Sequence, residues 1–206
     1  MIKLYGFPST RATRVAWLLE ELAIGWQYHK VDLFQGEHLQ PAFKDLNANG
    51  KVPVLVDQGI AITESAAICQ YLAEKYGRDK FLPLAATVES AIYHQWFSFI
   101  ITELEQPLWT MSKHKFILPI DKRCADILST AQWEFEKAIG VAENWLNSSH
   151  FLIGEQFTVV DILLTHTLNW ANNFEQVLPN KLEAYRTRLS QRPALKRAID
   201  KENKSL

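Results

Sequence analysis

The spacing of apolar positions in the first 76 residues changes several times, which predicts alternating strands and helices. An apolar run at residues 2–5, closed by Gly6 and Pro8, predicts a first strand. Over residues 12–22 the apolar positions recur at intervals of three and four, the spacing of a helix that buries one face. Residues 26–31 predict a second strand.

Two further apolar runs, 54–56 and 60–62, follow a polar segment in which residues 42–46 predict one helical turn. The three residues between these runs include Gly59, which is typical of a β-hairpin. Ser65 then begins a helix with one apolar face. The predicted order is β-α-β-(α)-β-β-α, an α/β layer whose first two strands are parallel and joined by a right-handed crossover.

The strand pattern ends near residue 85, and only helical spacing follows. Prolines lie between the predicted helices or at their starts, where proline is tolerated. We therefore expect an α/β domain at residues 1–78, a linker at 77–83 and an all-helical domain at 86–206. The helices of the second domain are predicted at residues 86–109, 120–146, 159–173 and 181–191.

Composition limits the possible partners. Lys and Arg total 22, Asp and Glu total 23, and 48% of residues are hydrophobic, which is ordinary globular composition. No basic block is present, so we expect neither a nucleic-acid nor a membrane partner. The longest apolar stretches fall short of the roughly 18 residues that a membrane span needs.

The two cysteines, Cys69 and Cys124, are too few and too far apart for a disulfide framework. The first residues contain no apolar signal core. We therefore expect a reducing, cytoplasmic location. The six histidines show no metal-binding spacing such as H-E-x-x-H, so no metal is expected.

The chain contains an ordered set of short motifs. They are Leu4-Tyr5-Gly6-Phe7-Pro8-Ser9-Thr10 with Arg14-Val15, Leu18-Leu19-Glu20-Glu21-Leu22, Gly36-Glu37-His38, Asn47-x-x-Gly50-Lys51-Val52-Pro53, Thr63-Glu64-Ser65-Ala66-Ala67-Ile68 and Phe157-Thr158-Val159-Val160-Asp161-Ile162. Each fragment alone is weak, but the ordered set is specific, and over essentially the whole chain it resembles the cytosolic glutathione transferases.

This resemblance implies a thioredoxin-like N-terminal domain that binds glutathione, joined to a helical domain that receives a hydrophobic co-substrate. It also implies a homodimer. The serine-type members, including phi-like, theta-like and zeta-like classes of bacterial type, are the most similar. One departure is Ala48, where the family usually has proline, which leaves the turn before Val52 less rigid.

The Val52-Pro53 bond matches the position of the cis-proline in thioredoxin-like folds, although most X–Pro bonds are trans. A cis bond would turn the N–H and C=O of Val52 outward, where an extended tripeptide could pair with them. His38 and Lys51 match residues that contact the glycyl carboxylate of glutathione in related transferases. Solvated side chains are the alternative interpretation for both.

Glu64 and Ser65 stand at the start of a predicted helix. A serine there could simply cap the helix. By resemblance, Glu64 would face the amino group of the γ-glutamyl end of glutathione, and Ser65 its carboxylate. The free N–H groups of a helix N-terminus also attract carboxylates, so the two interpretations are compatible.

Ser9 and Thr10 follow the first strand, where the resemblance implies activation of the glutathione thiol. Ser9 aligns with the active serine of phi-like and zeta-like classes, and Thr10 with that of theta-like and delta-like classes. Ser9 is preferred because Phe7-Pro8-Ser9 and Gly36-Glu37-His38 look phi-like. Tyr5 and Cys69 are expected to be structural, the latter as a buried and inert thiol.

The helical domain is expected to form the wall for the hydrophobic co-substrate, with ordinary core packing as the alternative. Thr158 and Asp161 fit a capping box, so Asp161 is expected to be structural. The candidates for the wall are Phe7, Trp109, Met111, His114 and Phe116.

The sequence thus predicts a glutathione transferase that ionises the glutathione thiol and conjugates it to an electrophilic hydrophobic substrate. Two alternatives remain. One is a glutathione-dependent peroxidase or disulfide reductase, and the other is a non-catalytic interaction protein of the same fold.

Overall fold

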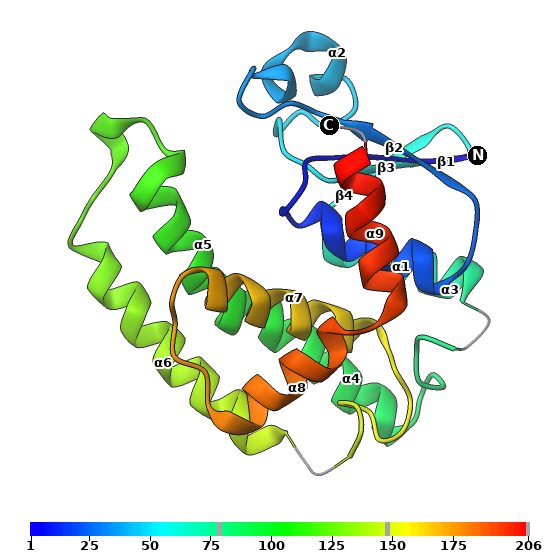
Figure 1. The fold of residues 1–206 in the computed structure, drawn as a ribbon, viewed down its shortest axis with the longest axis vertical. Helices are drawn as coiled ribbons and strands as arrows, with labels where there is room; N and C mark the ends of the chain where they lie inside the picture. Colours follow the sequence, from blue (N-terminus) through cyan, green and yellow to red (C-terminus); the bar gives the residue numbers. More distant parts are fainter. Residues whose placement is uncertain (78–79, 147–148, 205–206) are drawn as a thin grey trace. The chain divides into compact units, whose positions relative to one another are not determined.

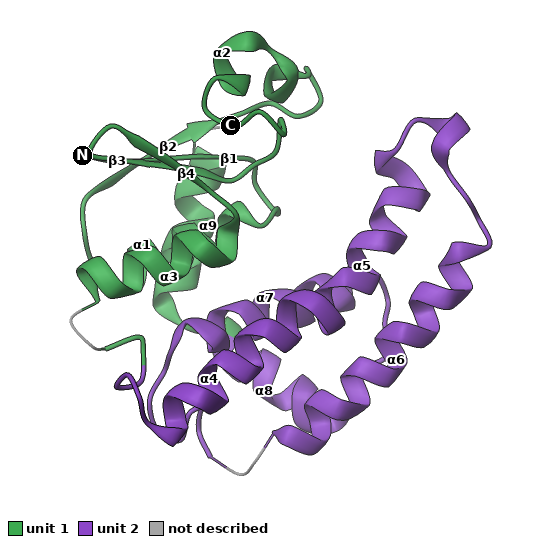
Figure 2. Cartoon of the chain, turned by 180° about the vertical axis from the view of Figure 1, so that it is seen from behind, with its two compact units in different colours: residues 1–82, 190–206 green, residues 83–189 purple. Residues whose placement is uncertain are grey.

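The computed structural model describes residues 1–77, 80–146 and 149–204. The chain forms two compact units: residues 1–82 together with 190–206, and residues 83–189 (Figure 2). Residues 78 and 79 of the predicted linker lie outside the described residues.

A four-stranded sheet in the order β2-β1-β3-β4 forms the centre of the first unit (Figure 1). β1 is parallel to β2, whereas the β1–β3 and β3–β4 pairs are antiparallel. This confirms the predicted thioredoxin-like order. The elements are β1 (Ile2–Gly6), α1 (Ala12–Glu21), β2 (Trp26–Lys30), the short 3₁₀ turn η1 (Glu37–Leu39), α2 (Pro41–Lys44), β3 (Val54–Asp57), β4 (Ile60–Thr63) and α3 (Ser65–Tyr76).

The β3–β4 hairpin has a two-residue turn rather than the three predicted from the sequence. Asp57 pairs with Ile60 and so belongs to the strand. Gln58 and Gly59 both have positive φ, 52° and 82°, as the favoured two-residue hairpin turns require. Asp57 is held there because one of its oxygens accepts hydrogen bonds from three side chains of α3: Tyr71, Lys75 and Tyr76.

The strand register gathers four chain segments at one edge of the sheet. Gly6 pairs with Lys30, Tyr5 pairs with Val54, and Val54 pairs with Thr63. The loop after β1, the segment after β2, the segment before β3 and the start of α3 therefore all leave the sheet at this edge. All the predicted glutathione-binding residues lie in these four segments.

A last helix, α9 (Pro193–Lys204), also belongs to the first unit, where it packs on α1 and β2 (Figure 1). The Thr13 hydroxyl donates to Glu202 at 2.9 Å, and Arg192 donates two hydrogen bonds to Glu21 at 2.6 and 2.9 Å. The sequence analysis predicted no helix here and assigned the segment to the helical domain at residues 86–206. The compact units divide differently because α9 buries its apolar side chains within the first unit.

In the described part of the second unit, the regular elements are all helical apart from two isolated bridges within residues 151–156. The predicted helix over residues 86–109 is interrupted by a π-helical turn, after which α5 begins. Pro107 cannot donate a hydrogen bond to the carbonyl of Glu103, which lies in that turn, so regular helix is not maintained there. The elements are α4 (Val88–Phe99), the π turn η2 (Ile100–Leu104), α5 (Glu105–Ser112), the π turn η3 (Lys113–Ile117), the 3₁₀ turn η4 (Ile120–Lys122), α6 (Ile127–Trp145), α7 (Val159–Asn173) and α8 (Asn180–Ser190).

α6 starts at Ile127, seven residues later than predicted, because residues 120–126 form a short turn and an exposed segment after Pro119. At the start of α7 the predicted capping box is confirmed. The buried carboxylate of Asp161 accepts hydrogen bonds from the backbone N–H and the hydroxyl of Thr158, from the N–H of Leu152 and from the hydroxyl of Tyr185. Among the described residues, no helix is both long and apolar enough to cross a bilayer.

Candidate glutathione site

Ser9 and Thr10 lie between β1 and α1, before the first helical residue, Ala12. The Thr10 hydroxyl donates its proton to the Phe7 carbonyl at 2.6 Å and accepts from the Ala12 N–H at 3.2 Å. Ser9 is exposed, with a positive φ of 60°. Its hydroxyl makes no hydrogen bond within the described part of the chain. The Thr10 hydroxyl therefore already donates its proton in a hydrogen bond, whereas the Ser9 hydroxyl does not.

The Val52-Pro53 peptide bond is cis, as predicted from the sequence. Asn47 organises the loop that leads to it. Its side-chain N–H donates to the Lys51 carbonyl at 2.7 Å, while its side-chain oxygen accepts from the N–H of Asn49 at 3.1 Å. These bonds fix the loop even though the family's usual proline is absent at position 48.

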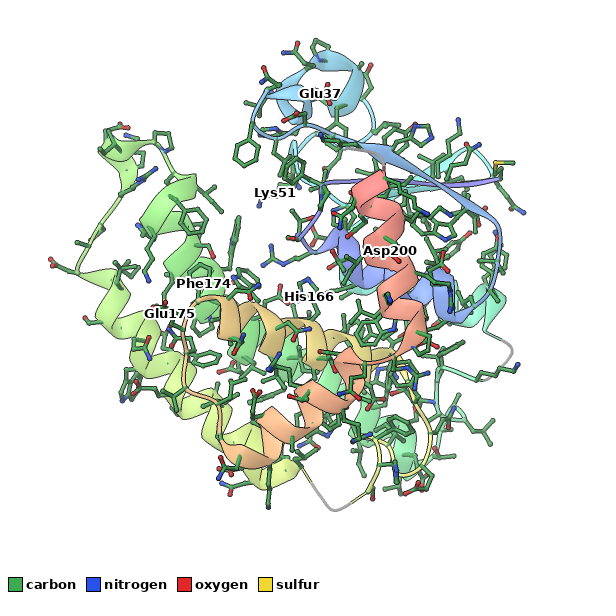
Figure 3. All side chains as sticks on the ribbon, viewed as in Figure 1. Glu37, Lys51, His166, Phe174, Glu175 and Asp200 are labelled. Carbon is green, nitrogen blue, oxygen red and sulfur yellow. The ribbon has the colours of Figure 1, made fainter. Side chains whose placement is uncertain are left out.

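The segments that carry His38 and Lys51 lie against each other. Gly50 has a φ of +59°, and a Cβ atom added to it would lie only 2.9 Å from the His38 carbonyl oxygen. Glycine is therefore required both by the backbone conformation and by the close approach of the two segments. The Lys51 side chain is exposed, and the Nδ1 atom of the half-buried His38 has no hydrogen-bond partner among the described residues. Figure 3 labels Lys51 and the neighbouring Glu37 on these loops.

Glu64 and Ser65 occupy the junction between β4 and α3. Glu64, not Ser65, is the N-cap residue, and it makes no side-chain capping bond, which corrects the capping role considered for the serine. Glu64 is exposed and has a φ of 65° and a ψ of 107°, a conformation rare for a residue with a side chain. Such outliers are typical of functional sites. Ser65 is buried, and its hydroxyl accepts a hydrogen bond from Arg14 at 3.4 Å.

Two residues that could compete for the chemical role make contacts of a structural kind. The Tyr5 ring, on β1, stacks on His29 with the ring centroids 4.8 Å apart. Cys69 is fully buried in α3, and burial raises the pKa of its thiol to about 12. Both observations agree with the predictions, and they leave the chain without a nucleophilic cysteine in this region.

The side chains predicted to receive a co-substrate differ in their exposure. Met111 is buried in the core of the second unit. The His114 ring accepts a hydrogen bond from the Cys124 N–H at 3.0 Å, which gives it a structural role. Phe116 is exposed and contacts Phe174, with the ring centroids 5.8 Å apart.

Sequence reasoning did not find Phe174, which follows α7 and also packs near Trp170. Trp109 is half-buried. Phe7, in the first unit, has its ring centroid 5.4 Å from that of Phe34. Among the described residues, no group of three or more His, Cys, Asp and Glu side chains is arranged to hold a metal ion.

A thioredoxin-like unit with these residues at one sheet edge, combined with an all-helical unit, defines the class of two-domain glutathione transferases. Residues 1–74 match the family model "Glutathione S-transferase, N-terminal domain". Residues 104–193 match the model "Glutathione S-transferase, C-terminal domain". Glutathione S-transferase 1 of Dianthus caryophyllus is 33% identical over 169 residues, which cover 79% of this chain and 74% of the relative. The chain belongs to the glutathione S-transferase family.

Solved structures agree with this assignment. A glutathione transferase homolog from Lodderomyces elongisporus, determined with two GSH per subunit, has a TM-score of 0.85 and 25% identity, covering 97% of each chain. The glutathione transferase URE2P8 from Phanerochaete chrysosporium, determined with oxidized glutathione, has a TM-score of 0.83 and 26% identity. That match covers 98% of this chain and 95% of the other.

Proposed function

We propose that this chain binds glutathione at the sheet edge of its first unit, ionises the glutathione thiol with the Ser9 hydroxyl, and transfers the sulfur to an electrophilic apolar substrate. The observation that carries the proposal is the difference between the two candidate hydroxyls. Thr10 already donates its only proton to the Phe7 carbonyl. Ser9 is exposed and its proton is available for a ligand sulfur.

One hydroxyl can supply most of the free energy needed to lower the pKa of the glutathione thiol. A free thiol has a pKa of about 8.5, so lowering it by two units requires about 2.7 kcal/mol. A hydrogen bond to a charged group supplies about 1.5–3 kcal/mol, and the nearby N-terminus of α1 adds about 0.3–1 kcal/mol. No general base is needed, because the ionised sulfur is itself the nucleophile. The site therefore acts by positioning and ionising glutathione.

The other ends of glutathione are assigned as the resemblance to the family implies, and the chemistry of the residues fits each assignment. Glu64 faces the γ-glutamyl amino group, and Ser65 together with the N-terminus of α3 receives the γ-glutamyl carboxylate. The backbone of Val52, beside Pro53, pairs with the extended peptide. His38 and Lys51 bind the glycyl carboxylate, and the close packing of their two segments supports this pairing.

The electrophile is expected to contact aromatic side chains of the second unit, near Trp109 and Phe116. We further expect a cytoplasmic homodimer, as in related transferases. A single monomeric species in analytical ultracentrifugation at micromolar concentration would contradict the dimer.

A second candidate is a glutathione-dependent disulfide reductase or peroxidase. It is favoured by the relatives solved with oxidized glutathione or with two GSH per subunit. In the reductase reaction, the bound thiolate attacks one sulfur of a disulfide and the other sulfur leaves as a thiol. A second glutathione then releases the first as glutathione disulfide. No protein thiol is required, which fits the buried Cys69.

A pH titration of the ultraviolet absorbance of bound thiolate tests the proposal. We expect the pKa of bound glutathione to lie well below that of the free thiol in the wild type and in Thr10→Val, and to return toward the free value in Ser9→Ala. An unchanged pKa in Ser9→Ala would transfer the role to Thr10 or the helix end. Absence of bound thiolate at every pH would leave only the interaction-protein alternative.

Rates with an aryl halide, a hydroperoxide and a mixed disulfide then separate the two enzymatic candidates. The proposal expects the aryl halide to react fastest. A fast reaction with the disulfide alone, still dependent on Ser9, would favour the reductase.

A further inference from the structure

The connection between α5 and α6, residues 113–123, carries an unusual concentration of exposed apolar side chains, and we call it the hairpin tip. Ile120 is 85% exposed, Phe116 56% and Ile117 49%. The chain here passes from the π turn η3 through Pro119 into the 3₁₀ turn η4. In Figure 1 the tip lies at one end of the α5–α6 hairpin.

The backbone of the hairpin tip is held in a fixed conformation. The Arg123 guanidinium donates to the carbonyl oxygens of Lys115, Phe116 and Leu118 at 2.9, 2.8 and 2.8 Å. These carbonyls end a helix and would otherwise need water or another donor. The N–H of Cys124 donates to the His114 ring at 3.0 Å. The apolar side chains therefore project from a turn whose backbone is held by these hydrogen bonds.

Basic side chains surround these apolar ones. The hairpin tip contains Lys113, Lys115, Lys122 and Arg123 against one acidic residue, Asp121, although the whole chain has a net charge of −1. Asp121 pairs with Lys122 at 3.2 Å, with both side chains about 70% exposed, so solvent weakens that pair. The near-zero net charge of the whole chain hides this local excess of positive charge. The expectation of no membrane partner was based on that net charge.

We propose that the hairpin tip docks on the surface of an anionic lipid bilayer. Ile117 and Ile120 enter the boundary between headgroups and acyl chains, while the lysines remain among the anionic headgroups. A protein partner fits less well, because the centre of a protein interface is depleted of charge and of lysine in particular. Here cations flank the apolar run 116–120 on both sides.

Co-sedimentation with phosphatidylcholine vesicles, with and without phosphatidylserine, tests the proposal. We expect the wild-type protein to bind the phosphatidylserine vesicles and to be released as ionic strength rises. Ile120→Glu should weaken binding at least ten-fold. The matched control is Ile60→Glu, which places the same charge at another exposed isoleucine, on β4, and should bind like the wild type.

Lys115→Gln and Lys122→Gln should each weaken binding about five-fold. Wild-type protein that ignores phosphatidylserine vesicles at low salt, or equal losses in Ile120→Glu and Ile60→Glu, would overturn the proposal. Sedimentation velocity on the same variants tests whether the hairpin tip is instead an interface between copies of this chain. If Ile120→Glu alone converts an oligomer to monomer, the hairpin tip is an interface between copies of this chain, and the proposal is wrong.

Discussion

The guanidinium of Arg14, fully buried on α1, donates a hydrogen bond to the hydroxyl of Ser65 at the first residue of α3. The bond joins the helix that follows Ser9 and Thr10 to the helix that begins at the proposed γ-glutamyl site. It also places a positive charge behind that site. Arg14 is thus a positioning residue for Ser65.

We predict that Ser65→Ala weakens glutathione binding about ten-fold, because it removes a hydrogen bond to a carboxylate. Arg14→Lys should raise the KM for glutathione more than it lowers kcat. In a double-mutant cycle, the effects of Arg14→Lys and Ser65→Ala should be non-additive by about 0.5–1.5 kcal/mol. Additive effects on the Kd of glutathione, measured by calorimetry, would refute the coupling.

Glu202 makes the stability of the first unit depend on pH. Its carboxyl group is buried between α9, α1 and β2, and burial raises its pKa from 4.5 to about 7, although the Thr13 hydroxyl opposes the shift. The Tyr28 hydroxyl on β2 is also buried, and its pKa is raised by burial and by the charge of Glu202.

Between pH 4.5 and 7 the native state holds a proton that the unfolded state has lost, so the free energy of unfolding falls as pH rises through this window. The full effect is about 3 kcal/mol. Chemical denaturation at pH 5 and pH 8 should show most of this loss in the wild type and a smaller one in Glu202→Gln. On α1, Glu20 pairs with Arg197 and Glu21 with Arg192. These pairs are present in the wild type and in Glu202→Gln, so any pH dependence that they cause is the same in both proteins.

Asp161 should be the most costly acidic side chain to remove from the second unit. Burial raises the pKa of this carboxyl, and four hydrogen bonds to it oppose the shift. Asp161→Ala leaves those donors unsatisfied and should lower the free energy of unfolding by about 2–4 kcal/mol. The N-cap residue of α4, Thr87, provides a comparison, since Thr87→Ala removes a half-buried cap and should cost about 1 kcal/mol. Equal losses in thermal denaturation would contradict the role of the buried network.

The two cysteines should differ sharply in reactivity. Cys124 is exposed, whereas Cys69 is buried with its thiol pKa raised to about 12. A thiol reagent should modify one group per native chain and two after unfolding. Cys124→Ser should leave the native protein unreactive and its glutathione-dependent activity unchanged. Rapid modification of native Cys124→Ser would show that Cys69 is accessible.

The order of elements in the first unit could be predicted because its apolar residues keep strict helical or strand spacing. The helix α9 was missed although Ala194, Leu195 and Ala198 have helical spacing. The next buried position on that face is Glu202, a charged residue that composition assigns to the surface. Arg14 was missed as a positioning residue for the same reason, because a buried arginine looks like a solvated one in the sequence.

The candidate site residues were predicted from motif positions, but the hydrogen bonds that these residues make were not. Nothing in the sequence indicates that Thr10 bonds to Phe7 and Ser9 does not, because the difference depends on the left-handed backbone at Ser9. The position of Glu64 at the helix N-cap and the brace formed by Arg123 similarly depend on local backbone geometry. The residue types specify which functional groups are available. The backbone conformation determines which hydroxyl can still donate its proton to a ligand.

The packing of α9 on α1 also affects how the protein is made. A ribosome releases residues 1–82 long before residues 193–204, so the first unit emerges with the face of α1 that α9 covers still open to water. The Thr13–Glu202 contact spans 189 positions and forms only after the whole helical unit has been synthesised. The first unit therefore begins to fold first but is completed last, and during that interval its nascent chain presents an apolar surface to chaperones.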